Sequence, residues 1–360
     1  MTARAPVVWC LCAALLFGAS TPVAKLLLDR DLGPFTLAGL LYLGAALAVL
    51  PGAFRGGSRR VAFGKRNLLL LGGAVLFGGV LGPVLLLKSL ELSSASSVSL
   101  WLNLETVGTA VLAWAFFKED LDRRTLVAIL LVVGGGALLA LPFEGDRLVA
   151  VALIAGACVC WGLDNNLTSL IDGFTPAQST LVKGTVAGAV NLAVGLSIEG
   201  APELDGGGLE LLLSALAVGG LGYGISLVLY IRGAQHLGAT RSQLIFAAAP
   251  FMGLVLSWVL VPGEGLEVAH LLAGVGMAAG ILMMLAAPHA HHHTHIPMLH
   301  THSHRHDDGH HDHVHPGLPS SHRHTHEHSH AAMEHSHPHR PDLHHRHVHE
   351  KTGQEADGEE

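Results

Sequence analysis

Residues 7–28 read VVWCLCAALLFGASTPVAKLLL, an apolar run in which Lys25 is the one charged side chain. About 20 apolar residues in a helix span the hydrocarbon core of a bilayer. The first part of the run, residues 7–19, resembles the apolar core of a cleaved signal peptide. Apolar character resumes after Pro22, however, so we predict an uncleaved transmembrane helix.

Nine further apolar runs of similar length follow. They lie at residues 34–53, 67–88, 95–117, 125–142, 148–171, 176–198, 209–231, 240–261 and 268–287. In lipid, backbone N–H and C=O groups must be satisfied within the segment, which requires helices for segments that do not close into a barrel. Charged residues make up 14% of the chain, against roughly 25% in soluble domains. We therefore predict an all-α membrane protein with ten transmembrane helices.

Basic side chains are unevenly distributed among the loops between these runs. Counted over ten helices, the loops at 54–66, 118–124 and 232–241 all lie on one side and are rich in Lys and Arg. The loops at 199–210 and 262–267, on the opposite side, contain acids and no base. An excess of Lys and Arg marks the cytoplasmic side. We expect a multi-pass protein of the bacterial inner membrane with both termini in the cytoplasm.

The sequence contains a weak internal repeat. When it is shifted by 144 residues, Phe17-Gly18 falls on Trp161-Gly162, and the apolar runs fall on one another. This divides the chain into two five-helix repeats, residues 1–143 and 144–287, and a tail at 288–360. Five crossings are an odd number, so the second repeat is expected to be inverted. Inverted repeats are typical of secondary transporters, with the substrate site near the midplane.

Two segments at matching places in the repeats carry a family resemblance. In the fourth run, residues 102–106 read LNLET, and the acidic-basic loop KED follows at 118–120. In the ninth run, residues 248–251 read AAPF. Together with the ten runs, these segments resemble the EamA family of the drug/metabolite transporter superfamily over roughly residues 7–287.

A bacterial subgroup of that family is the most similar, because residues 164–168 read DNNLT and the chain ends in a His-rich tail. The resemblance implies a ten-helix transporter that requires no cofactor, but it does not identify the substrate. Glu105-Thr106 in the first repeat stands where the second has Ala249-Pro250, so the two halves are expected to differ chemically.

Glu105 lies near the middle of its apolar run. A charged side chain at the centre of a bilayer costs roughly 3 kcal/mol on insertion scales, so intramembrane acids face the protein interior. Glu105 is therefore a candidate proton- or cation-coupling site, or a ligand for a cationic substrate. The alternative is a buried acid satisfied by neighbouring helices.

Asp164, Asn165 and Asn166 form a polar triplet inside the sixth run, and Thr21-Pro22 occupies the matching place in the first. Successive residues of a helix are offset by about 100°, so the three cannot share one face. At least one is expected to face a cavity, unless the helix is broken there, and broken helices at matching places often mark a transporter's binding site. Lys183, another candidate, either extends its amine to the membrane surface or pairs with Asp164 or Glu105.

The tail at 288–360 is extremely rich in histidine, with 25 of the 27 histidines of the chain at or after residue 289. It has too few apolar residues to form a core, so we predict that it is disordered without metal. Neutral imidazole binds Zn, Ni, Co and Cu. The candidate metal ligands are His291, His292, His293, His295, His300, His302, His304, His306, His322, His324, His326 and His328. The tail could deliver metal to the transporter, sense it or buffer it.

Three functions remain open at this point. The first is a secondary-active exporter of a small metabolite or drug-like solute, the second a divalent transition-metal exporter fed by the tail, and the third a membrane metal sensor that transports nothing.

The sequence contains no nucleophile constellation, no phosphate-binding Gly loop and no HExxH motif. We therefore expect neither enzyme activity nor ATP-driven transport. The expected partners are the lipid bilayer, a small-molecule substrate and transition-metal ions, with no nucleic acid and with a homodimer left open.

Deleting residues 289–360 should remove most of the Zn or Ni bound by the protein, because many weak imidazole contacts on one segment add up to multivalent binding. Calorimetry on detergent-solubilised protein measures this, and the affinity should fall as the pH drops through about 6.5 and the imidazoles become protonated. Equal metal stoichiometry in the full-length and truncated proteins would contradict the assignment of the tail as the metal site.

Overall fold

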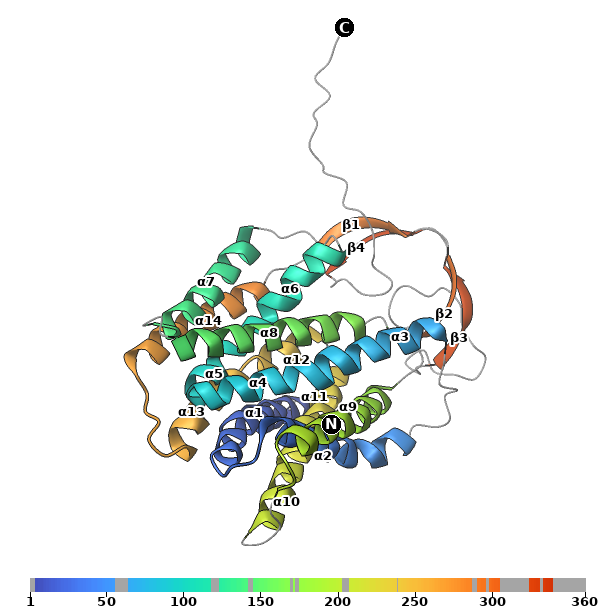
Figure 1. Cartoon of the computed structure of the whole chain (residues 1–360). Coiled ribbons are helices and arrows are strands. Elements are labelled where there is room, and N and C mark those ends of the chain that lie inside the picture. The colour runs from blue at the N-terminus through green and yellow to red at the C-terminus, as the bar shows by residue number, and fades with distance from the viewer. Residues whose placement is uncertain are drawn as a thin grey trace. The chain divides into compact units, whose positions relative to one another are not determined.

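The computed structural model describes residues 4–55, 64–117, 123–141, 145–168, 171, 175–202, 207–237 and 239–286, together with four short strands between residues 290 and 338. Residues 1–287 form one compact unit and residues 288–360 a second. The first unit is a bundle of helices (Figure 1). Each unit is described by itself.

Helix is present in each of the ten predicted ranges, as expected for apolar segments that satisfy their own backbone groups. The first repeat contains α1 (Arg4–Leu28), α2 (Pro34–Arg55), α3 (Lys65–Ala74), η1 (Val75–Leu81), α4 (Gly82–Leu92), α5 (Ala95–Trp101), α6 (Leu104–Phe117) and α7 (Arg123–Leu139). The second contains α8 (Gly145–Thr168), α9 (Pro176–Ile198), α10 (Gly208–Gly219), η2 (Gly220–Ile225), α11 (Ser226–Leu237), α12 (Ala239–Phe246), α13 (Ala249–Leu260) and α14 (Val268–Ala286).

Seven helical stretches of the described chain are long and apolar enough to cross a membrane. They are Ala5–Leu28, Pro34–Phe54, Lys65–Leu92, Gly145–Thr168, Ala177–Ile198, Gly208–Ala234 and Ser242–Leu260. The other three predicted spans fall short: the span at 95–117 is interrupted, α7 has only 17 residues, and the apolar part of α14 ends at Met284. A total of ten crossings therefore remains a prediction.

The two repeats deviate from regular α-helix at matching places. The π-helical segment η2 begins 145 residues after η1, in the third span of each repeat. The fourth spans are both interrupted, between α5 and α6 at residues 102–103 and between α12 and α13 at residues 247–248. This internal symmetry agrees with the repeat predicted from the sequence.

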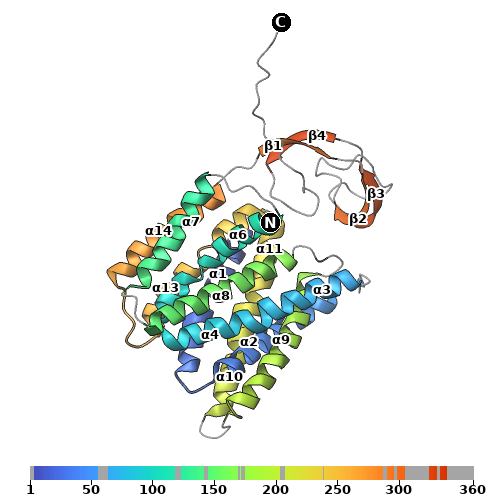
Figure 2. The ribbon, with the colours of Figure 1, turned by 45° about the horizontal axis from the view of Figure 1, so that its top comes forward.

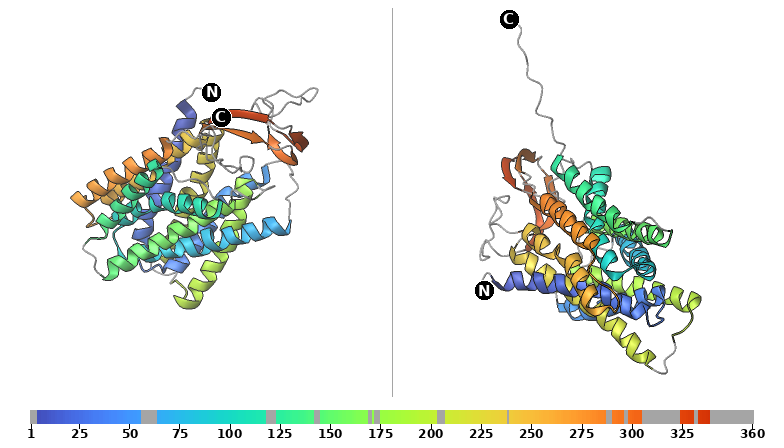
Figure 3. Two further views of the ribbon diagram at one scale, coloured as in Figure 1. Left: turned by 90° about the horizontal axis from the view of Figure 1, so that it is seen from above. Right: turned by 90° about the vertical axis from the view of Figure 1, so that its left-hand side faces the viewer.

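The packing follows the same symmetry. Helix α1 lies against α11 and α13 of the second repeat, whereas α8 lies against α4 and α6 of the first (Figures 1 and 3). Helices α2 and α9 pack together, and so do α7 and α14, as Figure 2 shows for the latter pair. Gly18 and Gly162 permit close approaches at matching places, because a Cβ at Gly18 would collide with the carbonyl oxygen of Ala249, and one at Gly162 would press on the backbone at Thr109.

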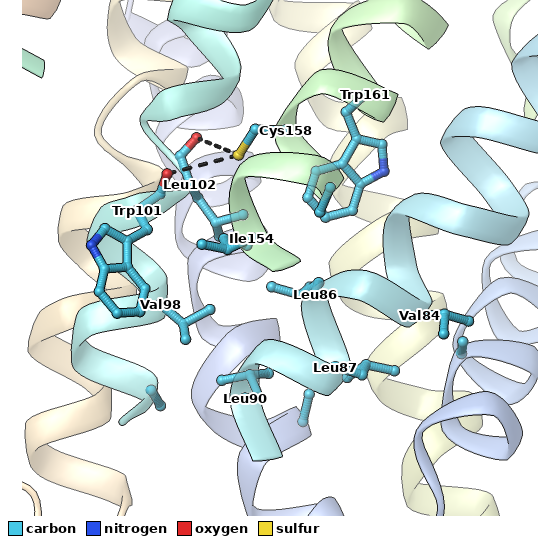
Figure 4. Close-up of a cluster of buried hydrophobic side chains, with 14 of the residues drawn as sticks. Val84, Leu86, Leu87, Leu90, Val98, Trp101, Leu102, Ile154, Cys158 and Trp161 are labelled. Atoms are coloured by element: carbon cyan, nitrogen blue, oxygen red, sulfur yellow. Dashed lines mark hydrogen bonds between the residues drawn. The ribbon is translucent and has the colours of Figure 1, made fainter. Parts of the chain in front are cut away.

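Buried side chains of α4, α5 and α8 form part of the core, around Trp101 and Ile154 (Figure 4). The interruption after α5 has its own partner there. The Cys158 thiol donates to the carbonyl oxygens of Trp101 and Leu102, at 3.7 and 4.0 Å (Figure 4). Leu102 O also accepts from the Glu105 N–H at 3.0 Å, so the carbonyl groups at the interruption have partners inside the protein.

The tail unit contains four strands, β1 (Ala290–His295), β2 (Met298–His304), β3 (His324–His330) and β4 (Met333–Pro338). Strand β1 pairs with β4 and β2 with β3, both antiparallel, so that His302 lies opposite His326 in the register. For these residues the prediction of disorder differs from the structure. Histidine alternating with Thr, Ser or Glu has the period of two of a strand, and pairing satisfies the backbone without an apolar core.

Ten of the predicted metal ligands lie on these strands. They are His291, His292, His293 and His295 on β1, His300, His302 and His304 on β2, and His324, His326 and His328 on β3. His306 and His322 lie outside the described residues.

Candidate functional site

A cavity of about 240 Å³ lies within the helical unit, between the two repeats. Its lining is Phe17, Tyr42, Ala45, Glu105, Trp161, Asn165, Thr180, Lys183, Gly184, Gly222, Tyr223, Ser226, Leu227 and Phe246. An apolar, aromatic wall with a few converging polar groups is the usual form of a small-molecule site.

Glu105 is in the first turn of α6, directly after the interruption of the fourth span. One of its carboxylate oxygens, Oε1, accepts a hydrogen bond from Asn165 Nδ2 at 2.9 Å. Helices α6 and α8 thus meet at the cavity through an acid and a neutral amide.

Asp164 and Lys183 form an ion pair between α8 and α9. The Lys183 Nζ lies 2.5 Å from Oδ2 and 2.6 Å from Oδ1 of Asp164, and the Thr168 hydroxyl donates to Oδ1 at 2.9 Å. The Asp164 residue is only 7% exposed. Of the two alternatives for Lys183, pairing with Asp164 is the one seen, because its amine points inward rather than to the membrane surface.

The π-helical segment η1 supports this ion pair. A Cβ at Gly78 would collide with the Asp164 carboxylate, so glycine is required at this contact. In η1, Phe77 O accepts from the Gly82 N–H, and the residue that would serve Gly78 O in the same way is Pro83, which has no N–H. The freed Gly78 oxygen accepts instead from Tyr42 Oη at 2.5 Å and Trp161 Nε1 at 3.1 Å. Two cavity-lining rings are held in place by this one carbonyl.

Of the two alternatives for the polar triplet, a side chain that faces the cavity is the one seen, because Asn165 lines the cavity and the helix is not broken there. Helix α8 continues through Thr168, and α1 continues to Leu28 with Pro22 inside it. The interruptions lie in the fourth spans instead. Two of the triplet side chains reach the site, since Asp164 binds Lys183 and Asn165 binds Glu105, whereas Asn166 Nδ2 donates to Gly162 O of its own helix at 2.8 Å.

The aromatic residues of the cavity were not predicted as site residues. Phe17 contacts Tyr223 and Phe246 at ring-centroid distances of 5.7 and 5.5 Å, and Tyr42 lies 5.9 Å from Tyr223. One feature of the sequence could have indicated two of these residues. The internal repeat aligns Phe17 with Trp161, and both line the cavity.

The charges around the cavity do not cancel. Asp164 and Lys183 neutralise each other at short distance, whereas the Glu105 carboxylate accepts a hydrogen bond from the neutral amide of Asn165. When Glu105 is ionised, these three groups leave a net charge of about −1 at a partly open cavity with a mainly apolar wall. Such a charge favours a proton or a cation.

The described residues contain no group of three or more His, Cys, Asp or Glu side chains placed to hold a metal ion. Cys10, Cys158 and Cys160 are buried free thiols, and Cys12 is exposed. In the part of the helical unit that the structure describes, the geometry thus provides no ready metal path.

Comparison with known proteins shows which family the chain belongs to. Residues 4–141 and 148–286 each match the model of the EamA-like transporter family. The chain belongs to the EamA-like transporter family. The family assignment makes the chain a multi-pass membrane protein built from two copies of one domain, and it indicates a transporter rather than an enzyme.

Two individual proteins are similar to this transporter. An uncharacterized transporter of Methanothermobacter thermautotrophicus is 26% identical over 297 residues, which cover 76% of this chain and 83% of that protein. A protein of known crystal structure superimposes with a TM-score of 0.54 at 16% identity, covering 78% of this chain and 96% of the other. The second likeness concerns the fold alone.

The ion pair generates a prediction about stability. Asp164→Asn or Lys183→Met alone leaves one poorly solvated charge without its partner and should destabilise the protein by about 3 kcal/mol, whereas the double variant should recover much of the loss. Thermal unfolding in detergent measures both effects. The matched control is Lys88→Met with Glu91→Gln, which removes an exposed pair at 2.9 Å and should change stability little. Additive losses in the Asp164 and Lys183 variants would contradict the pairing.

Proposed function

We propose that this protein is a secondary-active transporter that exports a small metabolite or drug-like solute, with the cavity around Glu105 as the substrate and coupling site. The observation that carries the proposal is the Glu105 carboxylate, which lines a cavity between two symmetric repeats and is bonded to a neutral amide. A site between repeats is accessible from either side when one repeat moves against the other.

Glu105 supplies a reason for ion coupling. An ionised carboxylate within a membrane span is costly, and either a proton or a cationic group on the solute reduces that cost. The Asp164–Lys183 pair is already neutral and needs no such partner. The rings of Phe17, Tyr223 and Phe246 offer an apolar surface for the body of the solute, and aromatic faces also attract cations.

The finer parts of the proposal rest on the sequence. The basic loops support an inner-membrane protein with both termini in the cytoplasm. The absence of a phosphate-binding Gly loop followed by Lys and Ser or Thr supports gradient-driven rather than ATP-driven transport.

The tail is proposed to bind Zn, Ni, Co or Cu through its histidines. The support is the sequence, in which 25 of the 27 histidines lie at or after residue 289. Divalent-metal export, the alternative function, is less well supported, because the described helical residues contain no group of three metal-ligating side chains. The non-transporting sensor is also less well supported, since it would have no use for a cavity between repeats.

Glu105→Gln tests the coupling role. The amide keeps the size and a hydrogen-bonding oxygen of Glu105 but cannot take up or release a proton, so solute-induced proton flux should fall to the level of protein-free liposomes. Proteoliposomes containing a pH-sensitive dye, screened with a panel of metabolites and amphipathic amines, measure this flux. Glu91→Gln, an acid in an exposed pair, is the matched control and should transport normally. Undiminished flux in the Glu105 variant across a range of pH would contradict the proposal.

A further inference from the structure

Glu199 joins the two repeats at the start of α2. It caps the C-terminus of α9, in the second repeat. Its Oε1 accepts from the backbone N–H of Phe35 at 2.9 Å, and its Oε2 accepts from the N–H of Thr36 at 2.9 Å and from the Thr36 hydroxyl at 2.8 Å. The first turn of α2, in the first repeat, thus takes its cap from the other repeat.

Glu264 makes the same contact at the start of α5. It lies between α13 and α14, also in the second repeat. Its Oε1 accepts from the N–H of Ala95 at 2.6 Å, and its Oε2 accepts from the N–H of Ser96 at 2.8 Å and from the Ser96 hydroxyl at 2.5 Å. Two acids of one repeat therefore each bind two backbone amides and one hydroxyl of the other.

The surrounding backbone is shaped for these contacts. Gly200, after Glu199, has φ of +87°, and Gly263, before Glu264, has φ of +84°, a region that other residues rarely adopt. A Cβ at Gly33 would occupy the position of the Glu199 carboxylate, and one at Gly195 would collide with the backbone of Thr36. The sequence thus leaves space for the Glu199 contact on both sides.

Both contacts lie at the same end of the helical unit. The Lys25 amine near the end of α1 donates to Leu90 O near the end of α4 at 2.9 Å, so these two helices end together. Helices α2 and α5 begin within a few residues of those ends.

The cavity lies away from this end. Lys183, which lines the cavity, precedes Glu199 on α9 by 16 residues, or about 24 Å along a helix axis.

The start of α9 is capped differently. Thr175 and Gln178 form a capping box within the second repeat, with hydrogen bonds of 3.2 and 2.9 Å, so this helix needs no group from the first repeat. Helices α2 and α9 are the second spans of their repeats. The contrast shows that a self-contained cap was available to this fold, whereas α2 instead depends on Glu199.

We propose that Glu199 and Glu264 are two latches that hold one end of the transporter closed, the end away from the cavity, and that the transport cycle breaks both. Alternating access requires the repeats to separate at each end in turn, so contacts that cross between repeats at one end must open. Hydrogen bonds from backbone amides to a carboxylate at a helix N-terminus are among the stronger polar contacts, because charge and helix dipole both favour them.

The latches are independent of the proposed role of Glu105. They require only that the two repeats move against each other, whatever the solute or the coupling ion. A test on conformation, rather than on transport, therefore leaves the two proposals separately falsifiable.

Pairs of spin labels can measure both ends of the full-length protein in lipid nanodiscs, with exposed Cys12 replaced by Ala. Labels at Arg30 and Ala201 report the latched end, and labels at Phe54 and Arg232 report the opposite end; each pair joins one repeat to the other. In Glu199→Gln with Glu264→Gln, the distance distribution at the latched end should shift to longer values, and that at the opposite end should shift to shorter values. Such a reciprocal change distinguishes a gate from local fraying of two helix ends.

Two further variants complete the design. Thr36→Val removes one of the three hydrogen bonds to Glu199 with little change in shape, so it should shift both distributions in the same directions by a smaller amount, even if the double variant folds poorly. Glu91→Gln, an acid near the end of α4 that pairs with Lys88 of its own repeat, should leave them unchanged. Wild-type distributions in the Glu199, Glu264 and Thr36 variants would overturn the proposal, as would lengthening at both ends together.

Discussion

The ion pair between Asp164 and Lys183 is the interaction on which the rest of the site depends. A carboxylate or ammonium group without a partner inside a membrane span would raise the free energy of the folded protein. Here the Lys183 amine donates to both carboxylate oxygens of Asp164, at 2.5–2.6 Å. Space for the pair comes from Gly78, and the same π-helical turn, with Pro83 after it, frees the Gly78 carbonyl for Tyr42 and Trp161. A π-helical turn, often found at functional sites, therefore serves the ion pair and the aromatic wall together.

The scaffold is symmetric, but its chemistry is not. Both repeats have a π-helical third span and an interrupted fourth span, and Gly18 of α1 and Gly162 of α8 each lie against the backbone of the opposite repeat. The residues at the interruptions differ, because α6 begins with Leu104-Glu105 and α13 with Ala249-Pro250. Glu105 of the first repeat therefore has no acidic counterpart at the matching place in the second repeat. The two carboxylates that cap helices of the first repeat, Glu199 and Glu264, also both come from the second repeat.

The sequence predicted the helical ranges and the repeat correctly, because both follow from apolar length and spacing. It also identified Glu105 and at least one residue of the polar triplet as facing the protein interior, since lipid tolerates few alternatives. It left a break at the polar triplet and at Thr21-Pro22 open as an alternative, because a proline inside a helix removes a backbone donor. In the folded protein α1 stays continuous, and the Gly18 carbonyl, which would accept from residue 22, lies close to Gly253 of α13. Local sequence does not contain that tertiary contact.

Other features could not be read from sequence for related reasons. The aromatic wall joins Phe17, Tyr42, Tyr223 and Phe246 from spans far apart in the chain, so no local motif marks it. The contacts of Glu199 and Glu264 cross between repeats and look like ordinary loop acids in the sequence. In the tail, composition indicated disorder, whereas the alternation of histidine with Thr and Ser is equally compatible with the strands that the structure contains.

We propose that Glu105 is the group in the cavity that takes up a proton, and that the Asp164–Lys183 pair does not. Infrared difference spectra between high and low pH, recorded on protein reconstituted in lipid, test it without a known substrate. The wild-type protein and the Asp164→Asn, Lys183→Met double variant should both gain the carbonyl band of a newly protonated carboxyl group in an apolar environment. The Glu105→Gln variant should lack that band. Persistence of the band in the Glu105→Gln protein would contradict the account.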